Sequence, residues 1–222
     1  MTRILQILLG LNIAICIICA SVTLTLNCGA LYDADIRNYG LEESTGMTYD
    51  EIRAEYDAMI RYNNIGGPDR LEFPTFAMSE TGRIHFEQVR VVFQAIEYAL
   101  IVTAVVSVLG IILSFRRRLH LYKLFTFVFA VGIPGAVGLA AAADWNAFFT
   151  NFHSIVFGNT YWIFDETTDP VITILPDGYF LHCLIMIIGV TLAAAVVFLL
   201  LYLFAKKNNP WPVGNNEQQN NE

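Results

Sequence analysis

The stretch Phe180–Ala205 reads FLHCLIMIIGVTLAAAVVFLLLYLFA, and this apolar run decides the fold class. It exceeds the length of about 20 residues that an α-helix needs to cross a bilayer. Comparable runs occupy Ile4–Leu26, Val91–Ser114 and Leu121–Ala143. Hydrophobic residues make up 55% of the 222-residue chain, and its mean hydropathy is +0.51. The sequence therefore predicts an all-α integral membrane protein with four transmembrane helices.

The positive charges indicate how these helices are oriented. They gather beside one set of helix ends, at Arg3, Arg116, Arg117, Arg118, Lys123, Lys206 and Lys207. By the positive-inside rule these ends are cytoplasmic, so both termini are predicted inside and two loops outside. The outer loops hold most of the acids behind the net charge of -7, which disfavours nucleic acid as a partner.

The predicted organisation follows from these runs and charges. In chain order it comprises a first transmembrane helix (1–27), a first outer loop with an amphipathic helix (28–90), two transmembrane helices (91–143), a second outer loop (144–179), a fourth transmembrane helix (180–207) and a disordered cytoplasmic tail (208–222).

The outer loops carry patterns of local structure. Thr48 and Glu51 have capping-box spacing, and the apolar residues after them recur at helical intervals, which predicts an amphipathic helix over Asp50–Tyr62. It is expected to lie on the membrane surface or on the other loop. Val171–Leu175 is predicted to be a strand, paired with an extended piece at Leu71–Phe73. The two loops would then form a small mixed α/β extracellular cap.

Two histidines stand out as candidate catalytic residues. His85 and His153 lie in different outer loops, each close to the predicted membrane boundary. Imidazole is suited to proton transfer near neutral pH. The second loop is also long, aromatic and free of Lys and Arg between Asn151 and Phe180, which is typical of a loop that builds a site. A metal site is disfavoured, because no HxxxH or HxxE cluster is present.

A polar stripe precedes and enters the second apolar run. Its members share one helical face, at Arg83, Glu87, Arg90, Gln94 and Glu97. Glu97 falls about 9 Å below Val91, and an ionisable residue at that depth usually faces the bundle interior or a wet cavity. Arg90 is its expected partner, and a purely structural ion-pair network is the alternative. Since His85 would point away from this stripe on an unbroken helix, we expect the helix to begin after His85. The alternative is that His85 and the polar stripe face different surfaces of the protein.

Three further polar or aromatic residues follow His153 in the second loop. Asn159 and Asp165 are of types that can orient an imidazole or assist an oxyanion. Trp162 is a candidate for the same site, and the alternative is a place in the interfacial aromatic belt.

Several segments together resemble a known family. They are LEFP at Leu71–Pro74, HFEQVR at His85–Arg90, FHSIVFGN at Phe152–Asn159, WIFD at Trp162–Asp165 and LPDGYF at Leu175–Phe180. With the four-span layout, they resemble the lipoprotein intramolecular transacylase (Lit-type) family of Gram-positive bacteria over about residues 1–207. The resemblance implies a multi-pass protein of the bacterial plasma membrane with its active site at the extracellular face.

The resemblance also implies an activity. An acyltransferase of this kind moves the sn-2 acyl chain of a diacylglyceryl lipoprotein to the α-amine of its N-terminal cysteine, giving the lyso-form. His85 and His153 match the essential histidines, with His85 favoured as the base and His153 as acid or oxyanion stabiliser. The five candidates for substrate binding or support are Arg90, Glu97, Asn159, Trp162 and Asp165. Lipoprotein and membrane lipid are the implied partners, with no cofactor, nucleic acid or obligate protein partner.

The cysteines leave alternatives open. Cys16 and Cys19 have CxxC spacing, which would suit a membrane thiol oxidoreductase, although both lie deep in an apolar run. Cys28 and Cys183 fall at outer helix ends, where a disulfide is compatible with the sequence. A structural tetraspan protein is the third reading.

Overall fold

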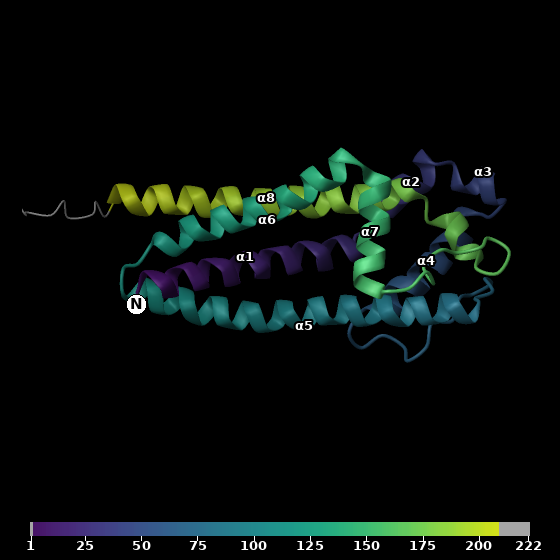
Figure 1. Ribbon diagram of the computed structural model, residues 1–222, viewed down its shortest axis with the longest axis horizontal. Coiled ribbons are helices and arrows are strands. Elements are labelled where there is room, and N and C mark those ends of the chain that lie inside the picture. The colour runs from purple at the N-terminus through teal and green to yellow at the C-terminus, as the bar shows by residue number, and fades with distance from the viewer. Residues whose placement is uncertain (1, 209–222) are drawn as a thin grey trace, which may run out of the picture.

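The computed structural model describes residues 2–208, and all regular structure within that range is helical. Four long helices run side by side along the molecule, and the shorter elements gather at one end (Figure 1). In chain order the elements are α1 (Arg3–Leu26), α2 (Gly29–Asn38), α3 (Leu41–Thr45), α4 (Tyr49–Asn63), α5 (Glu80–Arg116), α6 (Leu121–Ala143), α7 (Trp145–Phe157), the 3-10 helix η1 (Pro170–Ile174) and α8 (Asp177–Asn208).

The four predicted membrane spans are confirmed as the long helices α1, α5, α6 and α8, each long and apolar enough to cross a bilayer. Helix α1 packs against the other three. Small residues allow close approach, since Ala14, Ala130 and Ala195 are fully buried against one another. Large apolar side chains on the outside, such as Val105 and Leu109, are more than half exposed. A bundle with such a surface needs lipid as its solvent.

Helix α5 extends well beyond its apolar part, Val91–Ser114. It begins at Glu80, and the Ser79 hydroxyl accepts a hydrogen bond from the Gly82 N–H at 3.0 Å, so Ser79 is the N-cap. The first eleven residues rise about 16 Å above Val91 at 1.5 Å per residue. The expectation that this helix begins after His85 is wrong, because the Ser79 cap and the acidic first turn start it at Glu80, five residues before His85.

The first outer loop forms most of a separate small core, which we call the cap. Helix α4 confirms the predicted amphipathic helix, and both hydrogen bonds of the Thr48–Glu51 capping box are present. Its apolar face points into the cap, where the rings of Tyr32 and Tyr56 stack at 3.7 Å. The Tyr32 hydroxyl donates to the carbonyl of Ile174 at 2.8 Å, joining the two outer loops. Helix α4 therefore packs against the second outer loop, one of the two places expected for it, through the core it shares with Val171 and Ile174.

The predicted strand at Val171–Leu175 is wrong. Residues Pro170–Ile174 form the 3-10 helix η1, and Leu71–Phe73 has no ladder partner within residues 2–208. Pro170 sets the backbone for a helical first turn, and Val171 and Ile174, three residues apart, both point into the cap. Over the described residues the cap is helical and not mixed α/β.

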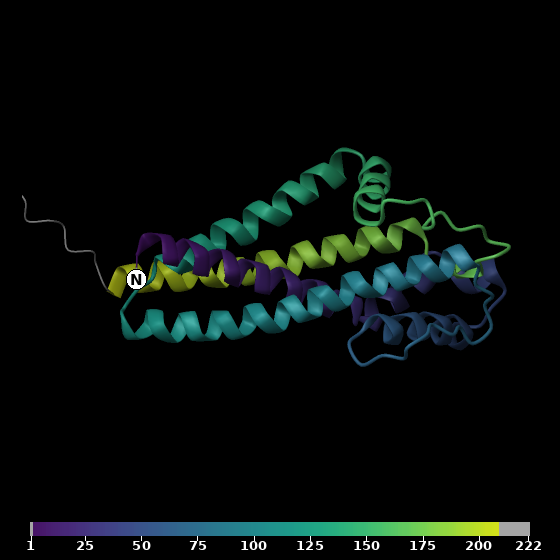
Figure 2. The same cartoon turned by 60° about the horizontal axis from the view of Figure 1, so that its bottom comes forward.

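The two ends of the bundle differ in character. The N-terminus and the α5–α6 turn lie at the end opposite the cap, as Figures 1 and 2 both show. Helix α8 also ends there, at Asn208. The predicted disordered tail, 208–222, falls outside the described residues apart from Asn208.

We predict that Gly10→Ala weakens the bundle. A Cβ at Gly10 would lie 2.5 Å from the Phe125 Cβ and 2.9 Å from the Tyr122 carbonyl oxygen, so α1 and α6 would have to separate. Overpacking of this kind destabilises by about 1–3 kcal/mol. The thermal unfolding midpoint in detergent should fall, whereas the matched Gly189→Ala variant, with nothing within 4 Å, should not lower it. Equal midpoints for the two variants would contradict the close helix contact.

Candidate active site

His85 lies in the part of α5 that rises above the membrane span. Its side chain is 6% exposed. The ring is 4.8 Å from that of Phe157 and 5.5 Å from that of Phe164, centroid to centroid. Its Nδ1 is buried and has no hydrogen-bond partner in the described chain. The imidazole is thus held by aromatic packing and not by polar contacts.

His153 is carried by α7, a short helix that crosses the end of the bundle (Figure 1). The helix starts where the Asp144 carboxylate accepts from the Ala147 N–H at 3.0 Å, and it ends at Gly158, whose φ of 66° favours glycine. His153 Nδ1 is 2.8 Å from the Phe149 carbonyl oxygen. Since a carbonyl only accepts, Nδ1 carries the proton and Nε2 of the neutral ring keeps its lone pair.

The structure brings the two histidines together. The centroids of the His85 and His153 rings are 6.1 Å apart and the ring planes are inclined by 36°. Phe157 packs against both rings, at 4.8 Å from His85 and 5.6 Å from His153. The Trp162 and Phe149 rings cover His153 at 4.7 and 4.1 Å. The pair therefore sits between aromatic walls contributed by the second outer loop.

These surroundings keep both imidazoles neutral. Burial and, to a smaller extent, the nearby His153 lower the pKa of His85 to about 4. Burial also lowers the pKa of His153, opposed by the hydrogen bond to the Phe149 carbonyl, which favours the protonated ring. No carboxylate hydrogen-bonds to either ring within residues 2–208. At neutral pH each ring can therefore accept a proton or donate a hydrogen bond.

A buried carboxylate, which sequence reasoning missed, fastens the second outer loop to α5. Asp169 is 3% exposed, and its Oδ1 accepts from the Ser79 N–H at 2.8 Å. The carboxylate sits so close to Gly82 that a Cβ there would collide with it. An anion at a helix N-terminus is stabilised by the free N–H groups and the helix dipole. This contact fixes the loop that follows His153 against the helix that carries His85.

Trp162 packs on the His153 ring, whereas Asn159 forms no hydrogen bond to either imidazole. The Asn159 side-chain amide donates to the Phe157 carbonyl at 2.9 Å and to Gln88 Oε1 on α5 at 3.1 Å. The Trp162 indole N–H donates to the Asn159 carbonyl at 3.0 Å. Both amide hydrogens of Asn159 are thus used within the protein, and the residue orients its neighbours.

Arg90 and Glu97 lie away from the histidines and hold the segment after α4. Arg90 donates to the Pro68 carbonyl at 2.7 Å and lies over the Tyr62 ring at 4.6 Å. Glu97 accepts from the Ile65 N–H at 2.7 Å. The expected pairing of Arg90 with Glu97 is not formed, because each meets a backbone group that the loop leaves free. The stripe and His85 therefore serve different surfaces.

Asp165 is a turn residue in the structure. It is exposed, and its carboxylate accepts from the N–H and hydroxyl of Thr167 at 2.8 and 2.5 Å, which lowers its pKa. It makes no contact with either histidine ring. Another pair was not foreseen, since His182 Nδ1 lies 2.8 Å from the fully buried carboxylate of Asp35 and joins α8 to α2.

The cysteines form no redox centre in the described residues. All four are free, so the disulfide considered between Cys28 and Cys183 is not formed. No group of three or more metal-ligating side chains occurs in residues 2–208.

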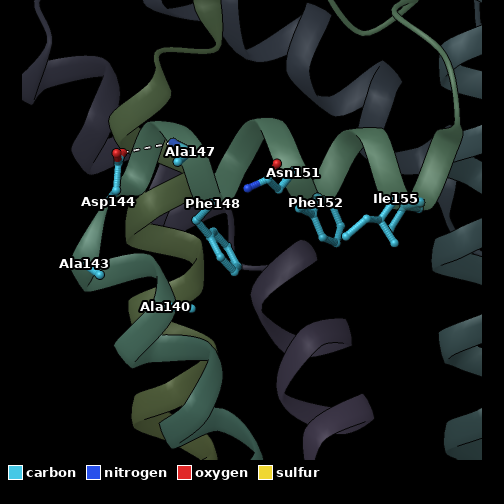
Figure 3. A pocket seen from close by; sticks show the side chains of 9 residues that line it. Ala140, Ala143, Asp144, Ala147, Phe148, Asn151, Phe152 and Ile155 are labelled. Atoms are coloured by element: carbon cyan, nitrogen blue, oxygen red, sulfur yellow. Dashed lines mark hydrogen bonds between the residues drawn. The ribbon is translucent and has the colours of Figure 1, made fainter.

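An apolar groove of about 430 Å³ lies where α6 meets α7 (Figure 3). Phe148, Asn151, Phe152 and Ile155 of α7 border it. Asn151 and Ile155 each stand two residues from His153, so they point nearly the opposite way around the helix. Helix α7 therefore turns different faces to His153 and to the groove, and neither histidine lines the groove.

Comparisons with known proteins agree with this geometry. Residues 7–180 match the family described as lipoprotein intramolecular transacylase Lit. The fold is similar to the in meso structure of the membrane integral lipoprotein intramolecular transacylase Lit from Bacillus cereus, with a TM-score of 0.89 and 29% identity over 93% of this chain and 96% of that one. Two structures of that protein with a histidine replaced by arginine or alanine give TM-scores of 0.84 and 0.85 at 28% identity, over 93% of this chain and 92% and 94% of those. No curated protein matches the chain in sequence.

We predict that burial of His85 makes stability depend on pH. An unfolded histidine has a pKa of about 6.5, so the unfolded chain takes up this proton first as the pH falls. The contribution is fully present above about pH 6.5 and is lost between there and about pH 4, the folded pKa of His85. Thermal unfolding midpoints measured across this range should fall less for His85→Phe than for the native chain. Parallel curves would show that the His85 ring is not desolvated.

Proposed function

We propose a function from the premise that the chain belongs to the lipoprotein intramolecular transacylase Lit family and is a membrane-integral acyltransferase. Its substrate is a diacylglyceryl lipoprotein. The sn-2 acyl chain leaves its glycerol ester and is captured by the α-amine of the N-terminal cysteine of the same molecule. One C–O bond breaks, one C–N bond forms, and the amine proton ends on the glycerol hydroxyl of the lyso product.

The observation that carries this proposal is the pair of neutral imidazoles 6.1 Å apart between aromatic walls. An α-amine has an unperturbed pKa of about 7.7–8.0, so it must lose a proton before it attacks an ester. An imidazole within hydrogen-bond reach accepts that proton. Because amine and ester share one molecule, the reaction needs no serine or cysteine nucleophile.

The geometry favours His153 as the base, the reverse of the order favoured from the sequence. Its Nδ1–H donates to the Phe149 carbonyl, which leaves Nε2 as acceptor and supports the imidazolium once it forms. The low pKa of His85 makes it a weak base but a neutral hydrogen-bond donor at any physiological pH. We assign His85 to the reacting carbonyl or to the relay of the proton to the glycerol oxygen.

The aromatic walls have two effects on such a reaction. Phe157 and Trp162 press against the rings and exclude water, which would otherwise hydrolyse the ester. They also restrict the flexible substrate to conformations in which amine and ester approach. Correct orientation of this kind contributes up to several kcal/mol to a reaction barrier.

The placement in the membrane belongs to the same proposal. The cations at the ends of the bundle remote from the cap indicate the cytoplasmic side, with both termini inside. The cap, His85 and His153 then face the extracellular side of a bacterial plasma membrane, level with the lipid headgroups. Exchange of an ester for an amide is downhill, so we include no nucleotide, metal or obligate protein partner.

Separate His85→Ala and His153→Ala variants test the assignment. Loss of a general acid–base group typically lowers a rate by 10²–10⁴-fold, and we expect losses of about that size for each. The measurement is mass spectrometry of a diacylglyceryl lipopeptide converted to its N-acylated lyso-form. His120→Ala, at the far end of the bundle beside Tyr202, is the matched control and should retain activity.

Wild-type rates in either variant would remove that histidine from the mechanism. A variant with serine at all four cysteines should keep full activity. If this variant lost acyl transfer but stayed folded, the result would favour a function that uses thiol chemistry, the alternative considered from the sequence.

A further inference from the structure

The proposed reaction needs a donor for the oxyanion that forms on the ester carbonyl, and the hydrogens of Asn159 are already used. We propose that the Gln88 side-chain amide on α5 donates to this oxyanion and that Asn159 sets its orientation. The inference rests on the proposed function, and no motif in the sequence analysis assigned a role to Gln88.

The orientation of Asn159 is fixed by backbone groups. Its Oδ1 accepts from the Tyr161 N–H at 3.0 Å, and its Nδ2 donates to the Phe157 carbonyl at 2.9 Å. A backbone N–H only donates and a carbonyl only accepts, so the amide has one allowed orientation. The second hydrogen on Nδ2 then points at Gln88, which must present its oxygen.

This constraint turns the NH₂ group of Gln88 away from Asn159. Its two hydrogens meet no acceptor within the described residues, whereas Oε1 is occupied at 3.1 Å. The side chain is half-buried, and its Nε2 is not among the buried orphan atoms, so a ligand can reach it. The two N–H donors of the Gln88 amide are therefore oriented and free to bind a ligand.

The position of Gln88 suits the reacting carbonyl. It follows His85 by three residues on α5, which makes the two neighbours on the helix surface with Cβ atoms about 5–6 Å apart. Its partner Asn159 is two residues from Phe157, whose ring touches both histidines. Glu87, which precedes Gln88 on the helix, points away and pairs with Arg83.

A neutral amide is suited to this task. It adds no charge that would shift the pKa of either histidine, and it donates at every pH at which they are active. The interaction strengthens as the carbonyl oxygen becomes negative and weakens when the carbonyl reforms, which lowers the barrier without holding the product.

Two Gln88 variants distinguish donation from support. Gln88→Met removes both donors, and Gln88→Glu keeps an oxygen for Asn159 while removing the NH₂ group. Each should convert a diacylglyceryl lipopeptide about 10²–10³-fold more slowly than the native enzyme, the loss typical of one oxyanion donor. The matched control is Gln94→Met, lower on the same helix, where the amide only donates to the Asn64 carbonyl at 3.3 Å. It should react at nearly the native rate.

A second readout separates a chemical role from a structural one. A lipopeptide with a phosphonate in place of the ester mimics the tetrahedral intermediate, and Gln88→Met should bind it more weakly by about the factor lost in rate, with unchanged affinity for product. The pH–rate profile of this variant should keep its native shape.

Each other result has one meaning. Rates within about threefold of native for both Gln88 variants overturn the donor role, as does full activity of Gln88→Glu alone. A loss of rate with a shifted profile or equally weakened product binding also overturns it, because the histidines have then moved. Failure of the native enzyme to form the N-acylated lyso product would instead refute the proposed function itself.

Discussion

The arrangement of the site depends on one electrostatic contact, the buried carboxylate of Asp169 against the first turn of α5. The helix end leaves backbone N–H groups without partners, and Asp169 satisfies one of them from the second outer loop. The loop that carries His153 is thereby tied to the helix that carries His85. Gly82 is required beneath this carboxylate, because any side chain there would displace it. Two residues far apart in the chain become neighbours through a contact that involves neither of them.

Elsewhere around the site, polar side chains hold the backbone of the outer loops, and aromatic side chains enclose the two histidines. Arg90 and Glu97 engage the loop after α4, and Asn159 engages the turn after α7. The histidines themselves meet few polar partners and are kept neutral by desolvation. Because no carboxylate hydrogen-bonds to His85 or His153 in the described chain, their basicity is set by aromatic packing and by the Phe149 carbonyl.

The sequence was most informative where a single physical rule dominates. Length and hydropathy predicted the four spans, and the Thr48–Glu51 box predicted α4. The resemblance and the scarcity of histidine drew attention to His85 and His153. The predicted strand at Val171–Leu175 was wrong because so short a run of mostly β-branched residues after a proline also fits a 3-10 turn.

Other features depend on tertiary contacts that no local pattern encodes. Asp169 and Gln88 matter because of what folds against them, and each would be unremarkable as an isolated letter. The pairing of Arg90 with Glu97 was expected from helical spacing, but a distant loop supplied better-placed partners. Helical spacing predicts which side chains share a face, but the tertiary fold determines which groups that face contacts.

The attachment of α7 gives the site a mechanical property. Asp144 alone separates α7 from α6, and α6 leans away from the other helices toward this end (Figure 2). Pro134 lies inside the continuous helix α6, where it removes one backbone hydrogen bond, and a Cβ at Gly132 or Gly135 would meet open space. The half of α6 after Pro134 is therefore weakly restrained at the middle of the helix and faces lipid along its side. A change in the tilt of this half of α6 would be transmitted through the one-residue link to His153, so the bilayer around α6 bears on the separation of the two histidines.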